Sequence, residues 1–148
     1  MIQYKRIARK DFRAIFFLTV LLFFLVTKGW YVLPEDAPHS IMKGFPFPYE
    51  CSGWHTSMSF QIFWLPLIID FIIYFLFTTI LFFLSKRIFR LDISKRVTMF
   101  LFVITSPILA FNIYVFFQDT NVHSFNLDFE YDVIKSEALL FFNRMKRI

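Results

Sequence analysis

Asp70 is the residue whose type and position most clearly suggest chemistry. It lies inside a long apolar run, about ten residues from the end of that run, or roughly 15 Å along a helix. A carboxylate in hydrocarbon costs at least about 2.5 kcal/mol, so we expect it to face protein or water. It could serve as a proton or cation site, as a hydrogen-bonded acid that holds helices together, or as a partner of Lys28. The second of these is our preferred interpretation.

Other polar residues of the apolar runs fall where they could surround Asp70. Two follow Asp70 on the same helical face, and another group recurs along one face of the next run. We predict that the two helices meet along these polar positions. The functional candidates besides Asp70 are therefore Tyr74, Thr78, Thr105, Ser106 and Asn112.

Cys51, His55 and His39 lie close together in sequence and form the second candidate group. Two imidazoles and a thiolate could bind zinc or copper, and Cys51 with His55 could form a nucleophile and base pair. The spacing lacks a second close pair of ligands, and nothing supplies an evident oxyanion site. We therefore expect ordinary loop residues at a membrane interface, with no metal and no cofactor.

Asp128, Glu130 and Asp132 form an acidic row at alternate positions. Calcium prefers such oxygen ligands, but the glycine turn of a calcium loop is missing. A solvated strand face accounts for the row fully.

The composition indicates a membrane protein. Of 148 residues, 57% are hydrophobic, 24 are Phe and only 18% are charged, and the mean hydropathy is +0.58. A soluble chain this short could not bury so much apolar surface. The net charge of +5 flanks the apolar runs, which argues against nucleic acid as a partner.

Three apolar runs are each long enough to cross a hydrocarbon core of about 30 Å, and they predict an all-α fold with three transmembrane helices. The predicted helices cover residues 14–33, 60–84 and 97–117. The first run could also be a signal peptide, but towards its end the chain carries Lys28-Gly29-Trp30-Tyr31, with bulky residues where small ones are needed for cleavage. Lys and Arg gather in residues 1–13 and 85–96, which places both segments in the cytoplasm.

The predicted extracytoplasmic parts are the loop 34–59 and the tail 118–148. Prolines forbid a regular helix through most of the loop, which carries Phe45 and Phe47 between prolines. Residues 124–133 alternate strictly between apolar and polar side chains, which predicts a short strand. Residues 134–148 have apolar side chains at helical spacing, which predicts an amphipathic helix.

These patterns favour a multi-pass protein of a bacterial inner membrane that serves as a non-enzymatic accessory or structural subunit of a larger complex. Its expected partners are the lipid bilayer and either another membrane protein or further copies of itself. A small oligomeric transporter or channel that uses Asp70 is the alternative. A membrane enzyme that uses Asp70 or the Cys51 and His55 loop is a further one.

Overall fold

The chain folds into three helices and a six-stranded mixed sheet, so the predicted all-α fold with three spans is wrong. The computed structural model describes residues 2–35, 39–53, 59–89, 94–127 and 129–140. Within them the chain forms two compact units. The helical unit comprises Met1–Phe24 and Phe71–Asn112, and the sheet unit comprises Leu25–Asp70 and Ile113–Ile148.

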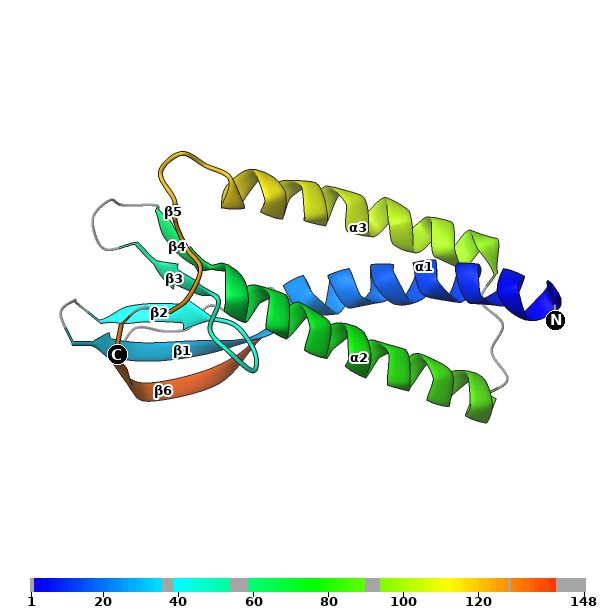
Figure 1. The fold of residues 1–148 in the computed structure, drawn as a ribbon, viewed down its shortest axis with the longest axis horizontal. Helices are drawn as coiled ribbons and strands as arrows, with labels where there is room; N and C mark the ends of the chain where they lie inside the picture. The colour runs from blue at the N-terminus through cyan, green and yellow to red at the C-terminus, as the bar shows by residue number, and fades with distance from the viewer. Residues whose placement is uncertain (1, 36–38, 54–58, 90–93, 128, 141–148) are drawn as a thin grey trace. The chain divides into compact units, whose positions relative to one another are not determined.

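The helical unit contains α1 (Ile2–Leu25), most of α2 (Trp64–Phe89) and most of α3 (Lys95–Phe116). Figure 1 shows α1, in blue, running between the other two helices. Aromatic rings make the contacts, with Phe12 of α1 against Phe75 of α2 and Phe17 of α1 against Phe102 of α3. Ala14 and Ile15 are buried with Phe82, which completes the α1–α2 interface. The first helix is thus the central packing element of this unit.

Two of the described helices, α2 and α3, are long and apolar enough to cross a membrane, by length and composition only. The first helix begins far earlier than predicted and includes the charged residues Asp11 and Arg13. It ends at Leu25, so its apolar part covers only residues 14–25. At 1.5 Å per residue that part is about 18 Å long, well short of a hydrocarbon core.

The sheet consists of five short or medium strands and one long strand. The order across the sheet is β5-β4-β3-β2-β1-β6, and every neighbouring pair is antiparallel except the parallel pair β4 and β5. The strands are β1 (Val26–Pro34), β2 (Ser40–Lys43), β3 (Glu50–Ser52), β4 (Phe60–Phe63), β5 (Val122–Ser124) and β6 (Tyr131–Leu140).

Two stretches that were predicted as helix are strands. The stretch Val26–Pro34 forms β1, which pairs with β2 on one side and β6 on the other, and Phe60–Phe63 forms β4. A strand inside a sheet that is covered on both faces can read as a continuous apolar run, as a buried helix does. The β-branched and aromatic residues around Gly29 were the local signal for a strand.

The tail prediction is also wrong in its boundaries. Residues 134–140 belong to β6 and not to an amphipathic helix, and residues 141–148 lie outside the described residues. The alternation over 124–133 continues past the short strand β5 into a connection that carries Leu127 and Phe129. Both side chains pack on the core cluster of Val32, Met42 and Phe63. The alternation therefore does not mark a single strand, because only its middle positions pack on the sheet core, while Phe125 and Val133 are exposed.

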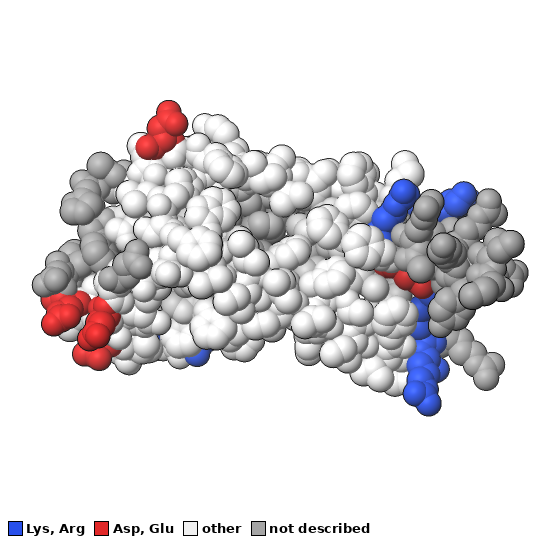
Figure 2. Space-filling model, viewed as in Figure 1, with Lys and Arg blue, Asp and Glu red and all other residues white. Residues whose placement is uncertain are grey.

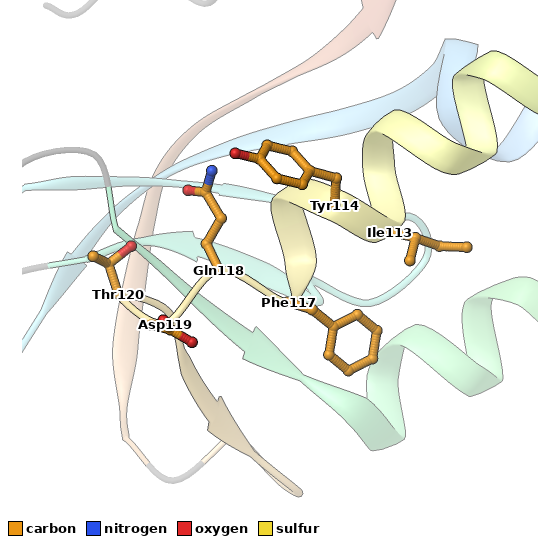
Figure 3. A pocket seen from close by; sticks show the side chains of 6 residues that line it. All are labelled: Ile113, Tyr114, Phe117, Gln118, Asp119 and Thr120. Atoms are coloured by element: carbon orange, nitrogen blue, oxygen red, sulfur yellow. The ribbon is translucent and has the colours of Figure 1, made fainter.

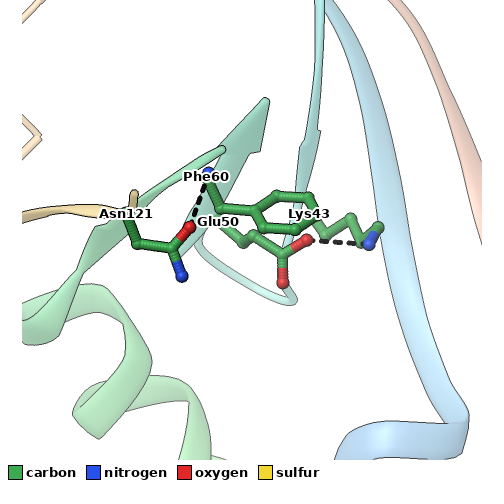
Figure 4. Close-up of polar contacts among 4 residues, drawn as sticks. All are labelled: Lys43, Glu50, Phe60 and Asn121. Carbon is green, nitrogen blue, oxygen red and sulfur yellow. Dashed lines mark hydrogen bonds and ion pairs between the residues drawn. The ribbon is translucent and has the colours of Figure 1, made fainter. Parts of the chain in front are cut away.

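Asn121 ties the end of α3 to the sheet. Its side-chain amide donates to the carbonyls of Val115 and Phe116, and its Oδ1 accepts from the Phe60 N–H at 2.9 Å. Figure 4 shows this bond beside the ion pair between Lys43 and Glu50, whose charged atoms lie 2.7 Å apart. Asn121 thereby satisfies two carbonyls that a helix end leaves without partners.

Candidate functional site

Asp70 binds the backbone of the loop between β2 and β3. Its Oδ2 accepts from the Phe45 N–H at 2.7 Å, and its Oδ1 accepts from the Phe47 N–H at 3.0 Å. The side chain is fully buried. A carboxylate offers two acceptor oxygens, and both are used here. Asp70 thus fastens the loop to the beginning of α2, inside the sheet unit.

Gly44 allows the loop to turn back towards Asp70. Its φ of +148° lies in a region that other residues rarely adopt. A Cβ at this position would come 2.0 Å from the Phe47 carbonyl oxygen, which no side chain can tolerate. The Gly44 N–H donates to the Lys28 carbonyl at 3.0 Å, and its own carbonyl accepts from the Trp30 indole N–H at 2.9 Å. The glycine is therefore bound to β1 on both sides.

The geometry bears on two of the roles considered for Asp70, namely an ion pair with Lys28 and a hydrogen-bonded structural acid. The ammonium of Lys28 lies 3.6 Å from the centre of the Trp30 ring, a cation–π contact, while both Asp70 oxygens bind backbone N–H groups. The arrangement is that of a structural acceptor. Pro66 lies in the first turn of α2, where a missing N–H costs no helix hydrogen bond.

The other polar candidates of the helices mostly bond within their own helix. Thr78 donates to the Tyr74 carbonyl, Thr105 to the Leu101 carbonyl, and Asn112 to the Ile108 carbonyl, each four residues earlier. Ser106 is half-buried beside Thr105 in α3. Back-bonding of this kind satisfies a hydroxyl in apolar surroundings without a second helix. Our prediction that these residues join α2 to α3 thus gains no support from their hydrogen bonds.

An ion pair between α1 and α2 was missed by our sequence analysis. The Lys86 ammonium lies 2.9 and 2.8 Å from the two oxygens of Asp11, and the side chains are 23% and 11% exposed. The signal was the single acid among the basic residues of the N-terminal segment. A contact with both carboxylate oxygens fixes the position of α1 along the axis of α2.

Breaking this ion pair tests its contribution to the helical unit. We expect Lys86→Met to lower the free energy of unfolding by about 1–2 kcal/mol, because Asp11 then keeps a buried charge without its partner. The Asp11→Asn, Lys86→Met double variant should lose less than the sum of the two single losses. Thermal unfolding in detergent measures all three, and strictly additive losses would contradict the coupling.

The residues proposed as metal ligands do not assemble into a described site. Cys51 is fully buried in the sheet core, and His39 is exposed with its ring stacked on Tyr31 at 5.5 Å. His55 lies outside the described residues. Within the residues that the structure describes, no group of three or more His, Cys, Asp or Glu side chains could hold a metal ion. A buried thiol is also poorly placed for nucleophilic attack.

The acidic row and a surface pocket at the end of α3 offer little chemistry. Glu130 precedes β6, Asp132 is exposed on β6, and Asp128 lies outside the described residues. A shallow pocket follows the end of α3, and Figure 3 shows its lining side chains spread around the last helical turn, with Asp119 as the charged one. The lining residues are Ile113, Tyr114, Phe117, Gln118, Asp119 and Thr120.

The partners of Asp70 are thus backbone N–H groups of a loop. The amino-acid composition does not reveal such partners. The spacing of Gly44, Pro46 and Pro48 was the available signal for a tight turn. Comparison with known proteins adds no further constraint, since no family model, no curated protein and no solved structure matches this chain.

Proposed function

We propose that this chain is a membrane-embedded accessory or structural protein, which anchors a small sheet unit at the bilayer surface and presents it to another membrane protein. The observation that carries the proposal is the apolar exterior of α2 and α3. Large hydrophobic side chains are widely exposed there, among them Ile88 at 68%, Met99 at 70% and Phe111 at 66%. Exposed apolar surface on this scale is unfavourable in water and favourable in lipid.

The distribution of charge supports an orientation. In Figure 2 the flanks of the helices are white, and the blue side chains of the helical unit gather at one end. Basic residues stand where α2 ends and where α3 begins, namely Lys86, Arg87, Lys95 and Arg96. Under the positive-inside rule these ends are cytoplasmic. Along the chain, β4 directly precedes the beginning of α2 and β5 follows the end of α3. We therefore propose that the strands are extracytoplasmic.

The geometry of Asp70 favours a structural role over transport or catalysis. A transported ion needs a carboxylate that water can reach and that can exchange its partners. Asp70 is fully buried, and each of its oxygens already accepts a backbone N–H. This is the role expected of an internal tie, and it supports the accessory function over an ion pathway.

The surface that we propose for the partner is the open edge of β6. Within the described residues β6 pairs with β1 alone, through nine of its ten residues, and stands at the end of the sheet. An unpaired edge offers alternating N–H and C=O groups to an added strand. The exposed Lys135 and Glu137 give the edge both signs of charge. We propose that an extended segment of the partner adds to β6.

A proline in β6 tests this edge without breaking the sheet. The Gly44 N–H binds the Lys28 carbonyl, so the backbone N–H and C=O of Lys28 point towards β2. Those of the next residue, Gly29, point towards β6. Gly29 stands opposite Glu137, which leaves the backbone N–H of the exposed Ser136 at the open edge. Ser136→Pro removes that N–H and should abolish the complex on native gels of gently solubilised membranes, with the fold preserved.

The matched control is Glu137→Pro, which removes a bond to β1 and should destabilise the sheet itself. Copurification of two differently tagged copies distinguishes a second copy from a different partner. A chain that runs as a monomer when gently solubilised, or a complex unaffected by Ser136→Pro, would overturn the edge proposal.

A further inference from the structure

The loop between β2 and β3 has no backbone N–H without an acceptor, although its side chains are exposed. The N–H groups of Gly44 and Tyr49 donate to the Lys28 and Lys43 carbonyls, at 3.0 and 2.8 Å. Those of Phe45 and Phe47 donate to Asp70. The two positions that remain between residues 44 and 49 are prolines, which carry no N–H.

Satisfied N–H groups are the requirement that hydrocarbon places on a non-helical segment. An N–H without an acceptor costs several kcal/mol in lipid, whereas in water it costs nothing to leave it to solvent. A loop exposed only to water therefore has no need for a buried carboxylate beneath it. Asp70 supplies the two acceptors that neighbouring strands do not.

The exposure and the lack of charge of the loop side chains support the same interpretation. Phe45 and Phe47 are each 49% exposed, and residues 44–49 contain no charged group. Leu65 and Ile68, in the turns of α2 that belong to the same unit, are exposed as well. An aromatic surface free of charge is typical of a segment that rests at the boundary between headgroups and acyl chains.

The position of Asp70 sets the depth. It follows Trp64, where α2 begins, by six residues, which corresponds to about 9 Å along the helix. Interfacial segments bury their apolar side chains by a similar amount, about 5–10 Å. The carbonyl oxygens of Gly44 and Tyr49 accept from the Trp30 indole and the Phe63 N–H, and at that depth water among the headgroups can still reach the other carbonyl oxygens of the loop.

We propose that residues 44–49 form a re-entrant loop that inserts Phe45 and Phe47 into the outer leaflet of the bilayer, held in its inserted shape by Asp70. The inference rests on the proposed function, because it requires α2 to cross the membrane. The loop then acts as a second, non-helical anchor that keeps the sheet unit against the lipid surface.

Fluorescent labels on the full chain test this insertion. The environment-sensitive dye NBD is attached to Phe47→Cys, and the protein is placed in vesicles of phosphatidylcholine and phosphatidylglycerol. Leu76→Cys, exposed in α2, serves as the lipid reference. Glu35→Cys serves as the water reference. Lys28 binds the loop at Gly44, and Glu35 lies seven residues further along the chain, or about 23 Å in an extended strand, so it is distant from the loop and exposed. The unsubstituted chain, with its buried Cys51, gives the background.

We expect the Phe47→Cys label to be quenched by doxyl lipids and to react with aqueous dithionite roughly tenfold more slowly than the Glu35→Cys label. Lipid quenching at Leu76→Cys with free dithionite access at Phe47→Cys would overturn the loop and leave the membrane placement intact. Protection of Phe47→Cys from both quenchers would mean that protein covers the loop, which also overturns it. Absence of lipid quenching at Leu76→Cys would overturn the membrane placement itself.

Discussion

Replacing Asp70 with Leu should destabilise the sheet unit by about 3 kcal/mol or more, because the Phe45 and Phe47 N–H groups lose both acceptors. Asp70→Asn should cost about half as much, since an amide retains one acceptor oxygen and turns a donor towards the second N–H. Unfolding in detergent micelles, followed by the midpoint and by tryptophan fluorescence, gives the order.

Asp119→Asn is the matched control, because Asp119 is an exposed acid in the same unit and its replacement should leave the midpoint unchanged. If both Asp70 variants unfold like the unsubstituted chain, Asp70 does not fasten the loop. Ion flux into liposomes that disappears in a fully stable Asp70→Asn variant would favour the transport alternative instead.

Gly44→Ala should be at least as damaging as Asp70→Leu, with a loss of about 3 kcal/mol or more. The added Cβ would come 2.0 Å from the Phe47 oxygen and 2.8 Å from the Tyr49 nitrogen, both backbone atoms, at a φ of +148°. The loop would have to open, and the Phe45 and Phe47 N–H groups would leave Asp70. The same unfolding measurement reports the loss.

Two comparisons make this second prediction specific. Phe45→Ala removes an exposed ring but keeps the N–H that binds Asp70, so it should cost less than about 1 kcal/mol in detergent. The Gly44→Ala, Asp70→Leu double variant should lose much less than the sum, because both changes release the same loop. Full additivity, or a harmless Gly44→Ala, would show that the loop geometry contributes little to stability.

The helices α2 and α3 were predictable in outline from sequence because their signal is local and long, whereas α1 occupies Ile2–Leu25 and not the expected 14–33. The run that became α3 was expected over 97–117, and the helix occupies Lys95–Phe116. The run expected over 60–84 became α2, which begins later, at Trp64 after β4, and ends later, at Phe89. The first run, expected as helix over 14–33, shows the limit of this signal, because it is helical only to Leu25 and continues as β1.

The sheet was not predictable in the same way, because its strands depend on partners far away in sequence. The strand β6 pairs with β1 across about a hundred residues, and helical spacing along 134–148 concealed it. The loop 34–59 was expected to lack a regular helix, but no strand was assigned to it, and it contributes β2 and β3. Short strands of three or four residues carry almost no periodicity of their own.

Asp70 was identified from sequence as the polar exception, but its partners were not. The expected partners were side chains on neighbouring helices, whereas the actual partners are two N–H groups of the Phe-Pro-Phe-Pro segment. Every residue except proline carries a backbone N–H, so residue identity does not show which N–H groups bind Asp70. The prolines that remove the remaining donors were visible, and together with a buried acid they indicate a loop built for apolar surroundings.

The most direct test of the central claim, that α2 and α3 cross a membrane with the sheet unit outside, is labelling by a membrane-impermeant thiol reagent in sealed vesicles of both orientations. Single cysteines replace Glu35 in the sheet unit, Lys95 at the beginning of α3 and Phe102 within α3, all of them exposed in the fold. We predict that Glu35→Cys reacts only from the extracytoplasmic side, Lys95→Cys only from the cytoplasmic side and Phe102→Cys from neither. Reaction of Glu35→Cys and Lys95→Cys from the same side, or ready reaction of Phe102→Cys, would contradict it.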